Sequence, residues 1–163
     1  MSYSVCRFPG GEGSVTSVCD DDAVARLLTV EMPSIVVFCL GGNDVYGNSG
    51  NVLVVGMRLY EYAQSLVAMG VKHVVVCQII RHQCVRRLSW DEGTQRVLEI
   101  NEFLRAVSDT DRLSFWVHRG FWQSLHNIFR ADGVHFNDRG NFKLWRSIKG
   151  AIFGALKRVH GER

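Results

Sequence analysis

Two short segments of the sequence combine residue types that could carry general-base and oxyanion-stabilising chemistry. Residues 41–44 read Gly-Gly-Asn-Asp: a glycine pair lets the backbone approach a ligand closely, and the Asn43 amide can donate a hydrogen bond to a developing oxyanion. Further along, Asp132 precedes His135 by three residues, so its carboxylate can hold Nδ1 and leave Nε2 free as a general base. Each segment alone is common in ordinary turns. Their occurrence together, in this order and each after a predicted strand, favours a single catalytic site.

The elements that must position these segments alternate along the chain. Short apolar, β-branched runs alternate with longer amphipathic stretches, which is typical of βαβ units and a parallel sheet. Strands are predicted at 3–7, 34–40, 71–80 and 113–118, and helices at about 20–29, 52–69, 92–107 and 138–159. Both chemical segments then lie beyond the carboxyl ends of strands, where open α/β sheets bind their ligands. We therefore expect an α/β fold, a three-layer α/β/α sandwich.

Two local features sharpen this expectation. Residues 41–51 are so rich in Gly and Asn that no regular element is predicted there. In the last helix, apolar residues recur at three- and four-residue spacing, which predicts a stripe that packs on the sheet. Its members are Phe142, Trp145, Ile148, Ile152 and Leu156.

Length and composition are those of one ordinary globular domain. The chain has 163 residues, 47% of them hydrophobic and 21% charged, and a net charge of +3, which excludes a disordered or collagen-like protein. We expect a single domain at 1–160 and a short tail at 161–163. No uncharged stretch reaches the ~18 apolar residues of a membrane span, and the first residues lack the apolar core of a signal peptide.

The cysteines indicate reduced thiols. Their number is odd, and no Cys-x-x-Cys pair occurs among Cys6, Cys19, Cys39, Cys77 and Cys84. This pattern favours a cytoplasmic protein over one with a disulfide framework.

A metal site was one alternative for part of this set, because His73, Cys77, His82 and Cys84 are close in sequence. Their spacing matches no closed zinc pattern, and Cys77 lies in an apolar run. A buried structural thiol is therefore the preferred interpretation, and no metal is predicted.

Longer stretches around both segments resemble a known family. LGGNDVY is similar to the Gly-x-Asn-Asp block of the SGNH (GDSL) hydrolases, and DGVHFNDRGNFKLWRSIKGAI resembles their final Asp-x-x-His block. Phe-Pro-Gly-Gly at 8–11 takes the place of the block whose glycine contributes to the oxyanion hole. The resemblance implies a flavodoxin-like parallel sheet and hydrolysis of a small carboxylic ester, or acyl transfer, through a covalent acyl-enzyme without metal or organic cofactor.

The same resemblance assigns roles to individual residues. Asp132 orients the base His135, while Asn43 and Gly10 form the oxyanion hole. Two further residues of the first segment are candidate substrate-binding residues, namely Gly42 and Asp44, of which Asp44 also holds the loop in shape.

One block of the family is missing from this sequence. The nucleophile of these enzymes is the Ser of a Gly-Asp-Ser block after the first strand, ahead of the glycine block, and no Gly-Asp-Ser occurs here. Only nine residues precede Gly10, too few for a strand, its turn and a parallel crossover. The nearby hydroxyls of Ser14, Ser17 and Ser49 lack the family's flanking residues, and turn or capping roles are preferred for them. The chain as given is therefore predicted to be inactive.

Three explanations of the missing block are open. The chain is a fragment or mis-started product of a longer esterase, a shortened protein that has lost covalent catalysis, or a protein that recruits the missing strand or serine from a partner. The first is preferred, because His135, Asp132 and Asn43 are all present. A sheet without its central strand has unpaired edges that invite self-association. The alternative function is a non-catalytic SGNH-like binding module, for a small acyl ligand or weakly for nucleic acid.

The remaining candidates have competing structural explanations. Phe121 and Trp122 follow the strand at 113–118 and could wall a substrate pocket or cover the edge of the core. Basic residues step along the last helix and could meet nucleic acid, but a net charge of +3 favours a solvated helix face. These residues are Arg139, Lys143, Arg146 and Lys149.

Overall fold

The computed structural model of the chain describes residues 22–46, 51–83, 88–122 and 127–161. In chain order, these residues form α2 (Asp22–Glu31), β1 (Ile35–Phe38), α3 (Gly42–Val45), α4 (Val52–Ala68), β2 (His73–Cys77), α5 (Trp90–Val107), β3 (Leu113–Trp116) and α6 (Asp138–His160). The strand predicted at 3–7 lies outside the described residues. The other predicted strands and helices are all confirmed, with each strand shorter than its apolar run.

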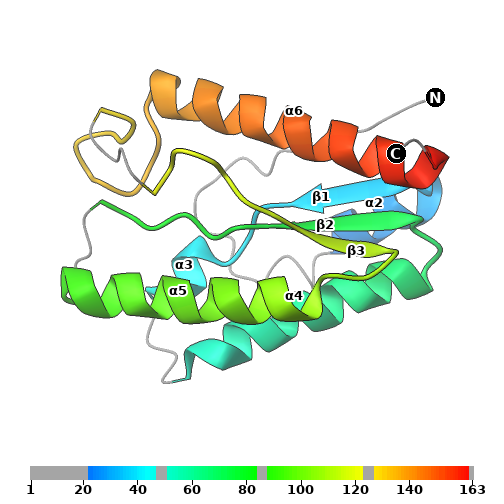
Figure 1. Cartoon of the computed structure of the whole chain (residues 1–163), viewed down its shortest axis with the longest axis horizontal. Coiled ribbons are helices and arrows are strands. Elements are labelled where there is room, and N and C mark those ends of the chain that lie inside the picture. Colours follow the sequence, from blue (N-terminus) through cyan, green and yellow to red (C-terminus); the bar gives the residue numbers. More distant parts are fainter. Residues whose placement is uncertain (1–21, 47–50, 84–87, 123–126, 162–163) are drawn as a thin grey trace.

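The described sheet is parallel, with strand order β1-β2-β3. Helix α6 covers one face of the sheet, and α4 and α5 cover the other (Figure 1). This arrangement confirms the predicted three-layer α/β/α sandwich. Because all three strands run the same way, their carboxyl ends lie along one rim of the sheet (Figure 1).

Local sequence explains where the long helices begin and end. Helix α4 begins after Asn51, whose side chain accepts a hydrogen bond from the backbone N–H of Leu53, and it ends before Gly70, which has a φ of 106°. Helix α5 begins with a capping box in which Ser89 and Glu92 each satisfy the other's backbone N–H. No helix of the described residues is long and apolar enough to cross a membrane.

The core centres on β2, whose five residues are all buried. The polar member is His73, whose ring nitrogens contact the carbonyl oxygen of Asp111 at 3.2 Å and the hydroxyl of Ser114 at 2.9 Å. Strand β1 is only partly covered, and within the described residues it pairs with β2 alone. Its run had suggested a strand covered on both faces, but the described residues leave it at the edge of the sheet.

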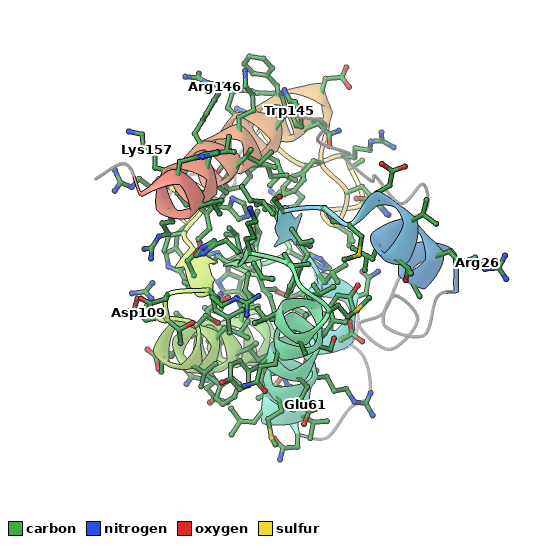
Figure 2. All side chains as sticks on the ribbon, turned by 90° about the vertical axis from the view of Figure 1, so that its right-hand side faces the viewer. Arg26, Glu61, Asp109, Trp145, Arg146 and Lys157 are labelled. Atoms are coloured by element: carbon green, nitrogen blue, oxygen red, sulfur yellow. The ribbon has the colours of Figure 1, made fainter. Side chains whose placement is uncertain are left out.

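The predicted packing stripe of α6 is wrong in part. Phe142 and Trp145 are 63% and 44% exposed, and Figure 2 shows Trp145 and Arg146 extending outward from this helix. The buried residues of α6 are small instead: Gly140, Ala151 and Ala155. Small side chains let the helix backbone approach the sheet closely, so bulky residues at neighbouring positions turn outward. The prediction of an irregular segment at 41–51 is also wrong in part, because α3 occupies its first residues.

Candidate active site

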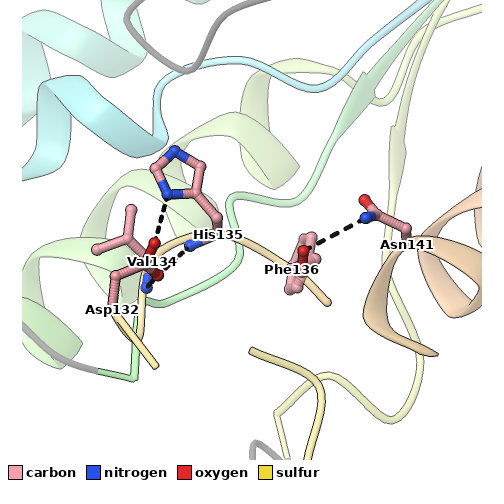
Figure 3. A network of polar contacts seen from close by, with 5 residues as sticks. All are labelled: Asp132, Val134, His135, Phe136 and Asn141. Carbon is pink, nitrogen blue, oxygen red and sulfur yellow. Dashed lines mark hydrogen bonds and ion pairs between the residues drawn. The ribbon is translucent and has the colours of Figure 1, made fainter. Parts of the chain in front are cut away.

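The turn from Asp132 to His135 connects the end of the β3 loop to α6 and is held by one carboxylate. Oδ1 of Asp132 accepts hydrogen bonds from the backbone N–H groups of Val134 (2.8 Å) and His135 (2.9 Å). Oδ2 lies 2.8 Å from Nδ1 of the His135 ring (Figure 3). A single aspartate therefore fixes both the backbone and the imidazole of this turn.

The electrostatics of the turn determine the tautomer of the histidine. The backbone N–H groups of His135 and Val134, followed by the His135 ring, hold the pKa of Asp132 well below its ordinary value. An ionised carboxylate only accepts hydrogen bonds, so Nδ1 of His135 carries the proton. Nε2 is then left with a lone pair, on a side chain that is 53% exposed.

The residues that flank the turn attach it to the start of α6. The backbone N–H of Arg130 donates to the carbonyl oxygen of His135 at 2.8 Å, and Phe129 and Phe136 form an isolated bridge. The side chain of Asn137 caps α6 by accepting from the N–H of Gly140 and donates to the carbonyl oxygen of Phe129. The Asp-x-x-His segment is therefore anchored from both ends.

The Gly-Gly-Asn-Asp segment turns sharply at the end of β1. Gly41 has a φ of 96°, which strains any other residue, and a Cβ built there would also lie 2.9 Å from Cδ1 of Ile79, whose side chain would have to move. The next residues form α3, on which Asn43 is exposed and Asp44 is partly buried.

His82 joins this segment to the turn. Its Nε2 lies 3.5 Å from the position of a Cβ built on Gly42, and its ring stacks on Tyr46 with centroids 4.3 Å apart. Its backbone N–H donates to the Tyr46 hydroxyl at 3.0 Å. The adjacent Gln83 donates its backbone N–H to the carbonyl oxygen of Gly133 at 2.7 Å. The loop after β2 thus contacts both predicted segments, which the structure brings to one rim.

In the sequence His82 is a candidate only for a metal ligand, and no local pattern indicates this bridging position. Burial, followed by the nearby His135, lowers the pKa of His82 from 6.5 to about 4, with Asp132 opposing the shift. His82 is therefore a neutral ring at neutral pH, and it limits how much positive charge accumulates beside His135.

This shift predicts a pH-dependent stability. The unfolded chain binds a proton to His82 near pH 6.5 and the folded chain only near pH 4, so stability falls as the pH drops through that window. We expect a loss of up to about 3 kcal/mol from this residue. Burial lowers the pKa of His73 too, so it contributes in the same direction.

Denaturant titrations between pH 7.5 and 4 measure this dependence. His82→Gln should reduce the dependence of the free energy of unfolding on pH. The matched change His160→Gln, on the exposed end of α6, should leave that dependence unchanged. Parallel curves for His82→Gln and the parent chain would contradict the prediction.

Asn101 is a second residue of the rim that the sequence analysis did not identify. This buried α5 side chain accepts from the N–H of Ile79 at 2.8 Å and donates to the Ile79 carbonyl oxygen at 2.9 Å. It therefore fixes the backbone immediately after β2, just before His82. An asparagine among apolar helix positions was the available sequence signal.

The two aromatic candidates behave differently. Phe121 is 2% exposed and packs with Ile128 and Phe129, which favours the packing interpretation, and its contact with a substrate stays a prediction. Trp122 is partly buried, and Cζ of the Arg81 guanidinium lies over its indole, 4.7 Å from the centroid of the Trp122 ring. Its contact with a substrate stays a prediction.

Lys143 of α6 has local partners, because its Nζ donates to the carbonyl oxygen of Gly120. Its Nζ also lies 4.8 Å from the ring centroid of Phe121. Arg139, Arg146 and Lys149 are exposed, as expected for a solvated helix face. The candidates Gly10, Ser14, Ser17 and Ser49 lie outside the described residues.

Comparison with known proteins decides the fold family. No protein-family model matches the chain, and no curated protein sequence does either. Among solved structures, it is similar to a “putative acylhydrolase” from Bacteroides fragilis, with a TM-score of 0.68 and 18% identity over 88% of this chain and 72% of that one. It is also similar to a GDSL-like lipase from Bacteroides thetaiotaomicron, with a TM-score of 0.67 and 20% identity over the same shares. The chain has the SGNH (GDSL) hydrolase fold.

This fold confirms the resemblance drawn from the two sequence blocks. At 18% and 20% identity the likeness concerns the fold, so the chemistry of this SGNH-fold chain has to be argued from its own residues.

Proposed function

We propose that this chain is an SGNH-type domain for carboxylic-ester hydrolysis, in which Asp132 orients His135 as the general base. The observation that carries this proposal is the carboxylate of Asp132, which holds the His135 backbone with one oxygen and Nδ1 with the other. This arrangement leaves Nε2 available near His82, at the rim where open α/β sheets bind ligands.

The proposed reaction is acyl transfer through a serine ester. A serine hydroxyl attacks the ester carbonyl carbon while Nε2 of His135 takes the hydroxyl proton. The carbonyl oxygen becomes an oxyanion, which accepts hydrogen bonds from the Asn43 amide and the Gly10 N–H. When the ester C–O bond breaks, His135 returns the proton to the leaving alcohol. Water then attacks the acyl-serine by the same steps and releases the acid.

The nucleophile of this reaction is not supplied by a Gly-Asp-Ser block within the 163 residues. We therefore expect the chain by itself to show at most the ~10³–10⁴-fold acceleration that an oxyanion hole and binding give without the nucleophile. Turnover of p-nitrophenyl acetate by the purified chain measures this. Robust turnover that His135→Ala abolishes and His160→Ala does not would contradict the inactivity and reveal another serine.

The coding sequence upstream of Met1 provides the complementary test. An in-frame Gly-Asp-Ser block after an apolar run predicts that the longer chain hydrolyses the ester and loses at least ~10³-fold with His135→Ala. The alternative is a binding module, favoured by the lack of Gly-Asp-Ser within the chain given. It predicts no turnover in either chain but saturable binding of a short fatty acid, with NMR shifts at Gly42 and His135.

A further inference from the structure

A second cluster of chemically active side chains lies on the same rim, apart from the Asp132–His135 turn. It consists of Cys39, Cys77 and His118, which follow or end the three strands in order. One ligand atom from each residue lies within 4.8 Å of the other two. Cys77 and His118 are 2% exposed, whereas Cys39 is exposed as a residue although its sulfur is directed into the cluster.

The pleat and register of the sheet bring these three residues together. Phe38 pairs with Val76, so Cys39 lies opposite Cys77 one position further along. Cys77 pairs with Trp116, and His118 comes two positions later.

Side-chain alternation places all three on one face. Val37, Val75 and Trp116 pack together against α6, and each lies two positions before one member of the cluster. The cluster therefore lies on the α6 side of the sheet. Grouping cysteines and histidines by sequence proximity misses it, because its members are about 40 residues apart.

The spacing of the donor atoms is close to that of a tetrahedral zinc site. Bond lengths of about 2.3 Å to sulfur and about 2.0–2.1 Å to nitrogen place two ligand atoms roughly 3.5–3.8 Å apart. Sγ of Cys39 lies 3.8 Å from Nε2 of His118. Small side-chain rotations are sufficient to close the remaining difference.

Hydrogen bonds already orient the histidine for this role. Nδ1 of His118 lies 2.8 Å from Oγ of Ser147 on α6, and the Trp116 indole N–H donates to the same oxygen at 3.0 Å. The backbone N–H of His118 donates to Oε1 of Gln78 at 3.0 Å. Such support of the second ring nitrogen is typical of metal-binding histidines and directs Nε2 toward the sulfurs.

We propose that Cys39, Cys77 and His118 form a Cys2His site for a thiophilic ion, Zn²⁺ in the first place. Two thiolates and an imidazole suit zinc and Cu⁺ and disfavour the oxygen-seeking Mg²⁺ and Ca²⁺. Three protein ligands leave a fourth position open, and the exposed Cys39 provides the route of entry.

Thiolate is the form of cysteine that binds metal, so zinc binding to Cys39 and Cys77 releases their protons. The apparent affinity should therefore rise with pH.

The site does not depend on the proposed esterase chemistry. The two clusters share no residue, although the Phe121 ring contacts both His118 and Phe136, the neighbour of His135 in sequence. Metal binding can therefore be measured without any turnover.

Titration of the reduced, chelator-treated full chain tests the proposal. We expect one equivalent of Zn²⁺ to bind by calorimetry and to raise the melting temperature. Co²⁺ should give thiolate charge-transfer and tetrahedral d–d absorption, and Mg²⁺ should give no signal. A Cu⁺ titration with a competing chelator decides which of the two ions binds more tightly; tighter Cu⁺ binding supports the site and reassigns its ion.

Variants separate this site from the other thiols. Cys39→Ala and Cys77→Ala should each weaken binding by more than the ~10–100-fold expected for the supporting change Ser147→Ala. The control chain with Cys6, Cys19 and Cys84 all changed to Ser should retain the affinity and the cobalt spectrum. Cys39→Ala is at the exposed position, so circular dichroism of this variant checks that lost affinity is not lost fold.

Three results would overturn the proposal. These are no stoichiometric zinc binding by the reduced chain, unchanged affinity in folded Cys39→Ala, and a cobalt complex without thiolate absorption. A Cys39–Cys77 disulfide found by mass spectrometry in chain purified without reductant, which persists in the presence of Zn²⁺, would assign the pair to redox chemistry instead.

Discussion

Gly140→Ala should lower the free energy of unfolding by about 2–3 kcal/mol, despite the helical propensity of alanine. A Cβ on Gly140 would overlap the carbonyl oxygen of Ile128 and would lie 2.9 Å from Cδ1 of Phe136. The first of these atoms belongs to the backbone and cannot rotate away. The start of α6 must therefore shift, and the Asp132–His135 turn shifts with it.

The same helix provides a matched control. A Cβ on Gly154 meets only Cζ3 of Trp116, at an ordinary contact distance of 3.7 Å. Gly154→Ala should therefore be neutral or stabilising by up to about 1 kcal/mol. Urea titrations measure both variants, and amide NMR shifts should move around His135 in Gly140→Ala alone. Equal stability of the two variants would show that α6 does not approach the loop as described.

Asn101→Ala should also cost about 2–4 kcal/mol, because it leaves two buried backbone groups of Ile79 without partners. The side chain supplies both the acceptor for the Ile79 N–H and the donor for its carbonyl oxygen, in a site where both residues are at most 5% exposed. Each orphaned group costs about 1–3 kcal/mol. The backbone between β2 and His82 loses its anchor, so the rim should loosen as well.

Gln95→Ala on the same helix separates this effect from lost helix propensity. Gln95 is exposed and bonds only to Glu99 among the described contacts, so its removal should change stability by less than about 0.5 kcal/mol. Hydrogen exchange of the Ile79–His82 amides should accelerate in Asn101→Ala only. Unchanged exchange there would contradict the anchoring role, whatever the change in global stability.

Prediction from the sequence was most successful where local chemistry decides. The end of α4 before Gly70, which has a positive φ, could be read directly, and the predicted start of α6 at 138 is confirmed. Helix α5 begins at Trp90, two residues before the predicted position, because the Ser89–Glu92 capping box determines its start. The packing face of α6 could not be predicted in this way. Periodicity identifies large apolar residues, whereas close packing on the sheet selects Gly and Ala.

In the candidate site, too, the local contacts could be predicted from the sequence and the long-range contacts could not. The Asp132–His135 contact spans three residues and follows from a local turn, so its spacing in sequence already indicated it. His82 and Asn101 act on backbone or rings that are 22 to 53 residues distant, and no local pattern indicates those partners.

The sequence by itself determined the parallel α/β layering, the two blocks at the carboxyl ends of strands and the lack of a Gly-Asp-Ser within these residues. Periodicity, turn chemistry and spacing encode those features locally. Only the tertiary structure decided that His82 joins the two blocks and that Cys39, Cys77 and His118 meet under α6. The physical reason is that strand register and the close approach of α6 place side chains from distant parts of the chain within contact distance.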